Sequence, residues 1–321
     1  MATNPDQLQQ EAEQRRQREA EVAALALLLL SRKRYDLPAL IASRKARIRP
    51  FRRISPSGVM AGDLARVYLR IVDAWRAEQP GLVAAYAASQ GIAGRDGLIR
   101  AMEEASARTE RAASIARRQM ADEIERIERW HRAQWVSRVK SATGLDVALL
   151  TNASDVAPEV TTAAAWNEQL AGDVHAQTKA RIITALLSGA AVAAPATRAA
   201  VKAQALEGPP SDPDEQPAET GADVGTPPSI EERIEDAVNK ARRRAKNIGT
   251  DQVEKTSASL TRARRQSAGV TSWRWRHYDP QPNPRIEHIR RDGRIYSDNR
   301  PPPTQCGEEP YCKCWEEPIF R

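Results

Sequence analysis

Histidine and cysteine residues near the C-terminus are the side chains of this sequence best suited to binding a metal ion. The chain has 3 cysteines, Cys306, Cys312 and Cys314, and His288 precedes them. A structural zinc ion takes four cysteine or histidine ligands, and a small irregular segment often needs such a staple to fold. These four residues would complete one zinc site, and His277 could replace Cys306 as the fourth ligand.

The same residues also allow two interpretations without a metal. His288 and the thiols could pack or hydrogen-bond with one another, or the thiols could form a disulfide after cell lysis. One residue separates Cys312 from Cys314, which is a tighter spacing than the spacer usual in structural zinc sites. An odd, clustered set of cysteines is also unlike the disulfide framework of a secreted protein. The expected cofactor is therefore either none or one structural zinc.

A catalytic site has little support in the sequence. His288 with Asp279 and Asp292 could form a loose metal-dependent nuclease site. However, the sequence contains no glycine-rich phosphate loop, no His-Glu-x-x-His pattern and no serine-centred nucleophile elbow. We therefore predict that the protein is not an enzyme.

Clusters of arginine could contact nucleic acid. The formal net charge is +7, and a further basic patch lies at residues 44–53. Contacts of arginine with the DNA backbone would be independent of base sequence and sensitive to salt. The same arginines could instead lie on a solvent-exposed face or on a face that contacts a partner protein. The candidate residues for contact with DNA or a partner are Arg242, Arg243, Arg244, Arg262, Arg264 and Arg265.

The elements that must position these residues are mostly helices. Aromatic residues make up only 5% of the chain, so a core would consist mainly of Ala, Leu, Ile and Val, which favours packed helices. Apolar residues recur at helical spacing within residues 1–206. The expected helices span residues 5–33, 63–79, 97–143 and 164–188.

Sequence signals also set the expected ends of these helices. Asp63 is a candidate N-cap, Pro80 and Gly81 should end the second helix, and Gly144 and Gly189 should end the next two. The apolar run at residues 22–30 is shorter than the roughly 20 residues that span a bilayer. We therefore expect no membrane anchor and no signal peptide.

The composition changes after residue 206. Residues 207–228 are acidic and rich in proline, which predicts a disordered linker. Ser229 with Glu232 forms a capping-box pattern, which predicts a helix to about Gln266 with a break near Gly249. Strand-like pieces follow at residues 271–278 and 294–296. The expected fold is mainly α, with a long helical region (1–206), an acidic disordered linker (207–228) and a small irregular α+β C-terminal module (229–321).

A series of spaced residues runs through the C-terminal module. A helix ends at a glycine, and a tryptophan-containing strand, a spaced Asp, Arg and His, an Asp-Gly turn and a Cys-x-Cys pair follow. The series is Asp251, Gln252, Lys255, Gly269, Trp275, Arg276, Asp279, Arg285, His288, Gly293, Cys312 and Cys314. This order resembles the phage Mu protein F-like family of head-morphogenesis proteins. The segment from Trp166 to Gly189 is similar to the helix that precedes the module in that family.

The resemblance implies a structural role in a tailed bacteriophage. Such a minor head protein would act in head morphogenesis near the portal vertex, with residues 1–206 binding portal or capsid. Its partners would be the portal protein, the major capsid or scaffolding protein, and genomic DNA without sequence preference. It would be found in the phage head, and in the host cytoplasm during assembly. The alternative function is a DNA-binding accessory protein that is packaged in the head and ejected with the genome.

Overall fold

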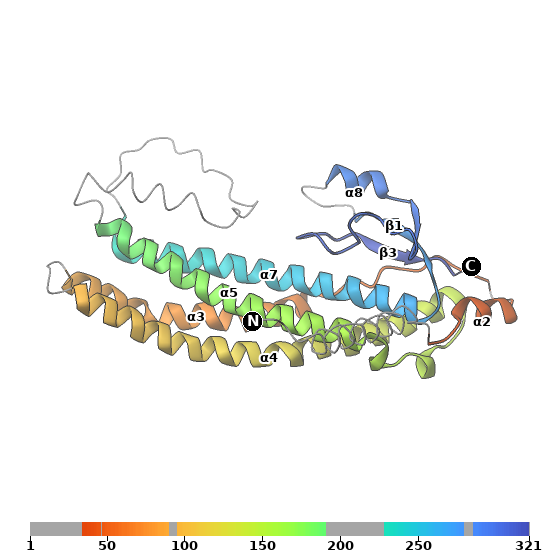
Figure 1. Cartoon of the computed structure of the whole chain (residues 1–321), viewed down its shortest axis with the longest axis horizontal. Helices are drawn as coiled ribbons and strands as arrows, with labels where there is room; N and C mark the ends of the chain where they lie inside the picture. The colour runs from red at the N-terminus through yellow and green to blue at the C-terminus, as the bar shows by residue number, and fades with distance from the viewer. Residues whose placement is uncertain (1–33, 46, 90–94, 191–227, 279–284, 321) are drawn as a thin grey trace, which may run out of the picture. The chain divides into compact units, whose positions relative to one another are not determined.

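A computed structural model describes residues 34–45, 47–89, 95–190, 228–278 and 285–320, which are mostly helical (Figure 1). The α-helices are α2 (Leu37–Ser43), α3 (Gly58–Ala88), α4 (Arg95–Thr143), α5 (Ala157–Ala190), α7 (Ile230–Ser267) and α8 (Ile286–Arg291). Two short 3-10 helices are η2 (Ala148–Leu150) and η3 (Ala153–Val156), and the strands are β1 (Ser272–Arg276), β2 (Ile295–Ser297) and β3 (Trp315–Pro318). The prediction of a mainly α protein with a small C-terminal α+β module is confirmed. The predicted helix at 5–33, and the linker at 207–228 except Pro228, lie outside the described residues.

The described residues form two compact units whose segments alternate along the chain. We call them the bundle unit, within 58–123 and 164–252, and the sheet unit, within 34–57, 124–163 and 253–320. The helices α4, α5 and α7 each contribute residues to both units. This differs from a division into successive segments, because the segment 229–321 is itself divided between residues 252 and 253.

Four helices pack together in the bundle unit. The buried hydroxyl of Tyr68 on α3 donates a hydrogen bond of 2.6 Å to Asn167 Oδ1 on α5. The hydroxyl of Thr109 on α4 lies 3.0 Å from Nε2 of His175 on α5. The first part of α7 contacts α3 at Gly249, where an added Cβ would lie 2.6 Å from the Cα atom of Ala65. Glycine is therefore needed for this close approach, and the predicted break at Gly249 is wrong, because α7 continues through it.

Helix α3 is longer than its sequence signals predicted. It begins at Gly58, so Asp63 is not its N-cap, and the Asp63 carboxylate instead pairs with Arg66. It also continues through Pro80 and Gly81 to Ala88, which contradicts the predicted end. Proline removes one backbone hydrogen bond from a helix interior. Leu82, two residues after Pro80, is only 1% exposed, and its burial in the bundle helps to offset that loss.

Other helix ends lie where local signals placed them. The Ser229 and Glu232 side chains and backbone amides exchange the two hydrogen bonds of a capping box, at 2.7 and 3.2 Å. Helix α4 ends at Thr143, and Gly144 adopts a left-handed φ of 75°. Only local backbone geometry decides these ends, which explains the agreement.

The sheet unit contains a three-stranded antiparallel sheet in the order β2-β1-β3. In the register of β1 with β3, Trp273 pairs with Pro318 and Arg276 with Trp315. A separate hydrophobic cluster of this unit contains Phe51, Trp135 and Phe320, with ring centroids 5.5 Å apart for the first pair. The sequence did not predict β3 or α8.

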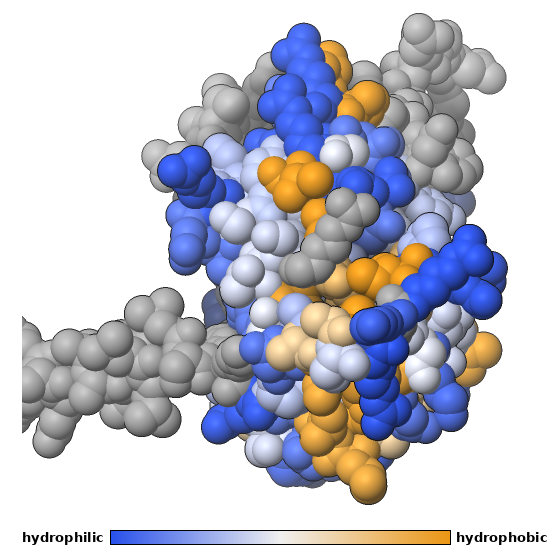
Figure 2. All heavy atoms as spheres, turned by 90° about the vertical axis from the view of Figure 1, so that its right-hand side faces the viewer, coloured by the Kyte–Doolittle hydropathy of each residue, from blue (hydrophilic) through white to orange (hydrophobic). Residues whose placement is uncertain are grey.

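The surface of the described residues is mixed in character. In the face drawn in Figure 2, hydrophobic side chains lie in patches among hydrophilic ones. Among the residues that the structure describes, no helix combines the length and hydropathy needed to cross a membrane.

Candidate metal centre

Three elements of the sheet unit bring the predicted metal ligands together. His277 follows the last residue of β1, His288 lies on α8, and Cys312 and Cys314 precede β3. Because Arg276 pairs with Trp315 in antiparallel register, the next residue pair in the same register is His277 with Cys314. Strand pairing therefore places one histidine beside one cysteine, and α8 supplies the second histidine.

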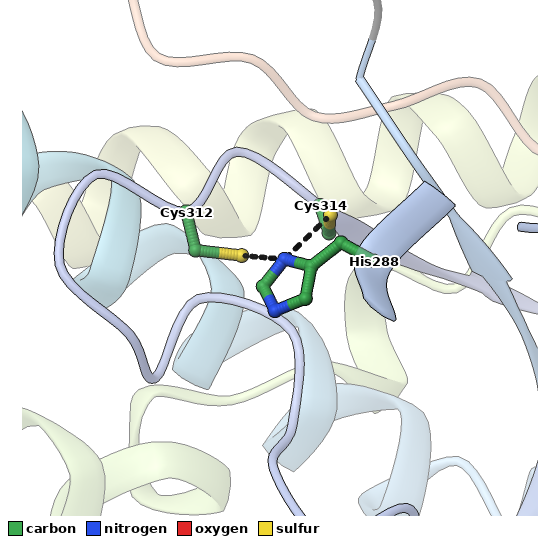
Figure 3. A group of neighbouring side chains, drawn as sticks. All are labelled: His288, Cys312 and Cys314. Atoms are coloured by element: carbon green, nitrogen blue, oxygen red, sulfur yellow. Dashed lines mark hydrogen bonds between the residues drawn. The ribbon is translucent and has the colours of Figure 1, made fainter. Parts of the chain in front are cut away.

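One imidazole nitrogen of His288 faces both cysteines (Figure 3). Its Nδ1 atom lies 3.5 Å from Cys312 Sγ and 3.5 Å from Cys314 Sγ. One ligand atom from each of these three residues can be chosen so that all lie within 4.8 Å of one another. All three are buried, with at most 3% of each residue exposed. The structure thus contains a buried His288–Cys312–Cys314 group that is close enough to bind a metal ion.

Hydrogen bonding alone accounts poorly for this arrangement. A ring nitrogen has either one N–H or one lone pair, so it can form one linear hydrogen bond. Here two sulfur atoms lie at the same distance from the same nitrogen. A metal ion would instead bind the nitrogen and both sulfur atoms at once.

The other side of the His288 ring meets a carboxylate. Its Nε2 atom lies 3.4 Å from Oε2 of Glu309, without hydrogen-bond geometry. The same oxygen of Glu309 pairs with Arg285 at 2.8 Å. Trp275 packs edge-on against the imidazole, with ring centroids 5.3 Å apart. Sequence reasoning missed Glu309; its position three residues before Cys312 is the signal that could have indicated it.

The two neighbouring thiols differ in acidity. A hydrogen bond between them lowers the pKa of Cys312 and raises the pKa of Cys314. The pair therefore loses its first proton more readily than an isolated thiol does, and its second proton less readily. Metal ions bind the thiolate form, so the first of these effects favours metal binding.

Cys306 lies outside the group of three, although it packs in the same buried cluster as Cys312 and Cys314. Cys306 is a free, buried thiol beside Trp273 and Trp275, outside the group of three. Its carbonyl oxygen accepts a hydrogen bond of 3.1 Å from Arg262. Burial raises the pKa of its thiol well above the ordinary value. Neither Cys306 nor His277 belongs to the group of three, so the fourth ligand stays a prediction.

The residues that carry the family resemblance lie in different places. Asp251 and Gln252 are buried on α7 in the bundle unit, and Lys255 follows on α7 in the sheet unit. Asp279 lies outside the described residues. The remaining residues of the series lie in the sheet unit: Gly269, Trp275, Arg276, Arg285, His288, Gly293, Cys312 and Cys314.

Two glycines and two arginines of the series have clear structural roles. Gly269 and Gly293 have left-handed φ values of 69° and 76° at turns, and the Gly293 amide donates a 2.9 Å hydrogen bond to the Trp275 carbonyl. Arg276 pairs with Glu317 across β1 and β3 at 2.7 Å. Arg285 pairs with Glu309, which faces His288.

Three arginines proposed for DNA or partner contact are engaged inside the sheet unit. Arg264 and Arg265 are each 1% exposed. Arg264 donates to Glu128 at 2.5 Å, and Arg265 donates to Asp298 at 2.6 Å and to Glu316 at 3.1 Å. Arg262 donates to the other oxygen of Glu316 at 2.8 Å. These ion pairs hold the core together, so we correct the placement of Arg264 and Arg265 at a contact surface.

The second arginine cluster lies on α7 in the bundle unit. Arg243 is exposed, whereas Arg242 and Arg244 are partly buried. Arg242 pairs with Asp73 on α3. Of the six candidates, Arg243 is therefore the exposed one, and Arg242 and Arg244 are partly accessible.

Comparisons with known proteins gave no match: no family model, no curated protein and no solved structure matches this chain.

Proposed function

We propose that this protein is a structural minor head protein of a tailed bacteriophage that acts in head morphogenesis near the portal vertex. The observation that carries the proposal is the ordered residue series that resembles the phage Mu protein F-like family. Its last part, from Gly269 to Cys314, supplies the turns, strand pairs and ligand group of one small module. A series of that kind specifies a structural module better than it specifies an active site.

An open apolar groove supports contact with a protein partner. The groove lies between helices α4 and α5 of the bundle unit and has a volume of about 280 Å³. Ile99 and Leu187 in the groove are 57% and 63% exposed. Exposed apolar surface of this kind marks protein contacts more often than DNA contacts. The apolar lining residues are Leu98, Ile99, Met102, Ile183, Leu186 and Leu187.

We further propose that the His288–Cys312–Cys314 group holds one structural zinc ion. Zinc prefers thiolate and imidazole ligands, whereas magnesium and calcium prefer oxygen. The module is small, and a metal would tie its C-terminal segment to α8. This role is structural and adds no catalytic step.

Sedimentation with the purified portal protein of the same phage tests the head function. We expect the full chain to sediment with portal assemblies, and Ile99→Asp to reduce the bound fraction at least about tenfold, because it places a charge in the groove. Leu149→Asp is the matched control, since Leu149 is 95% exposed in the sheet unit.

A gel shift with DNA at two salt concentrations distinguishes the alternative function, a DNA-binding accessory protein, from the proposed one. A chain that shifts DNA strongly at low salt and weakly at high salt, and that fails to sediment with the portal protein, would be the ejected DNA-binding accessory instead. Binding to the portal protein with no DNA shift would support the proposal.

A further inference from the structure

We infer that His277 completes a Cys2His2 zinc site with His288, Cys312 and Cys314, and that Glu309 orients the His288 ring. This inference rests on the proposed zinc ion but not on the proposed role in the phage head. It names a different fourth ligand from Cys306 and adds a residue that does not touch the metal.

The distances between the ligand atoms match the edges of a zinc tetrahedron. Zinc lies about 2.3 Å from sulfur and about 2.0 Å from nitrogen, so a tetrahedral site separates sulfur and nitrogen by about 3.5 Å. The Nδ1 atom of His288 lies 3.5 Å from each sulfur. The Nδ1 atom of His277 lies 3.6 Å from Cys314 Sγ. Each of these three sulfur–nitrogen distances fits a shared metal ion.

Strand register explains why His277 is available as a metal ligand. It continues the pairing of β1 with β3 by one residue, opposite Cys314. Its backbone amide donates a 2.8 Å hydrogen bond to the Asp292 carboxylate, which fixes the main chain just after β1. His277 lies outside the group of three, so its ring would have to turn toward Cys312 and His288 to close the fourth side of the site. Cys306 packs in the same cluster as Cys312 and Cys314, but among the described residues its sulfur lies outside the group of three ligand atoms.

Glu309 lies where a metal-binding histidine usually has a carboxylate partner. Metal-binding histidines usually donate their other N–H to a carboxylate or a carbonyl, which fixes the ring and raises its basicity. With Nδ1 of His288 facing the sulfur atoms, the free Nε2 faces Glu309 Oε2 at 3.4 Å. Arg285 holds the same carboxylate. Metal binding to Nδ1 would leave the proton on Nε2, which faces the Glu309 carboxylate; a small shift of that carboxylate would complete the hydrogen bond.

Metal analysis of the full chain, purified without added metal, tests the site. We expect about one equivalent of zinc in the unmodified protein, as one tetrahedral site requires. Cys312→Ser, Cys314→Ser, His288→Ala and His277→Ala should each lose most of it. Cys306→Ser is the matched control, because it also changes a buried thiol of the same module, and it should keep the zinc.

Cobalt(II) in place of zinc keeps the test valid if a variant folds poorly. Tetrahedral cobalt gives visible absorption, and its thiolate bands grow with the number of sulfur ligands. His277→Cys should retain the metal and strengthen the thiolate bands, whereas a residue that only packs would give no such gain. Glu309→Gln should weaken binding by about 10- to 100-fold without changing the visible spectrum.

The outcomes distinguish the claims. Full zinc in His277→Ala together with loss in Cys306→Ser would overturn the assignment of His277 and restore Cys306. An unmodified protein without zinc would overturn both the zinc proposal and this inference, and would leave the portal experiment unaffected.

Discussion

At the scale of single residues, a buried chain of polar groups connects α4 to α7 in the sheet unit. Arg264 donates to Glu128, and its guanidinium also lies 3.4 Å from Nδ1 of His131. The other ring nitrogen of His131 lies 2.9 Å from the Thr261 hydroxyl, which donates to the Ser257 carbonyl. This pattern fits a neutral His131 with its proton on Nε2. The buried arginine therefore has one anionic partner that neutralises it at close range.

Removing that partner should destabilise the protein strongly. Glu128→Gln keeps the shape of the side chain but leaves Arg264 charged and without its close carboxylate, which should cost about 3–5 kcal/mol. The measurement is the free energy of unfolding from urea titration. Glu125→Gln is the control, because its pair with Arg129 is exposed and should contribute little. Equal losses in the two variants would contradict the prediction.

His131 should also make stability depend on pH. Burial, followed by the charge of Arg264, holds the pKa of His131 well below 6.5 in the folded state. As the pH falls below about 6.5, His131 binds a proton in the unfolded chain but stays neutral in the folded chain, so the free energy of unfolding decreases. The His131 contribution changes by up to about 1.4 kcal/mol per pH unit.

The change with pH is best measured as a difference between variants. The free energy of unfolding of the original protein minus that of His131→Gln should decrease between about pH 6.5 and about pH 5. Subtraction removes the titration of other groups. A difference that stays constant over this range would show that His131 is protonated in the folded state.

At the scale of elements, the contact of α7 with α3 depends on Gly249. Gly249→Ala would gain helix propensity of about 1 kcal/mol, but its Cβ would overlap the Ala65 backbone and side chain at 2.6–2.7 Å. Such overpacking costs about 1–3 kcal/mol, so we expect a net loss of stability. Gly62→Ala on α3 meets no described atom within 4 Å and should be stabilising. Thermal unfolding of both variants checks the opposite signs.

Elements governed by local signals could be predicted from the sequence, and those governed by distant contacts could not. The capping box at Ser229 and the left-handed Gly144 are local, and both lie where expected. The continuation of α3 through Pro80 depends on packing against other helices. Strand β3 pairs with a strand about forty residues earlier in the chain, and a four-residue segment carries no periodicity that would indicate it.

The same distinction applies to the candidate metal centre. Residue type alone indicated His288, Cys312 and Cys314, because thiols and imidazoles are rare and clustered in this chain. Residue type could not show that His277 lies opposite Cys314, since that depends on the register of β1 with β3. Glu309 was missed for a related reason: its partner His288 lies on α8, a helix that the sequence did not predict.

At the scale of the whole molecule, the two units share long helices but draw on different parts of them. The bundle unit needs α7 only as far as residue 252, and the sheet unit needs its continuation from residue 253. The early part of α7 buries Ile234, Val238 and Ala245. Truncation before this part of α7 and truncation after it should therefore affect folding differently.

Two truncated chains test this division. A chain ending at residue 252 keeps every segment of the bundle unit, so it should retain a cooperative thermal transition, although it loses the last segment of the sheet unit. A chain ending at residue 228 also loses the α7 segment, so it exposes the apolar faces of the remaining helices and should aggregate or unfold without a sharp transition. Circular dichroism during heating, with sedimentation to detect aggregates, measures both. If the shorter chain melts as cooperatively as the longer one, the early part of α7 is dispensable for the bundle, and the proposed division of the chain is wrong.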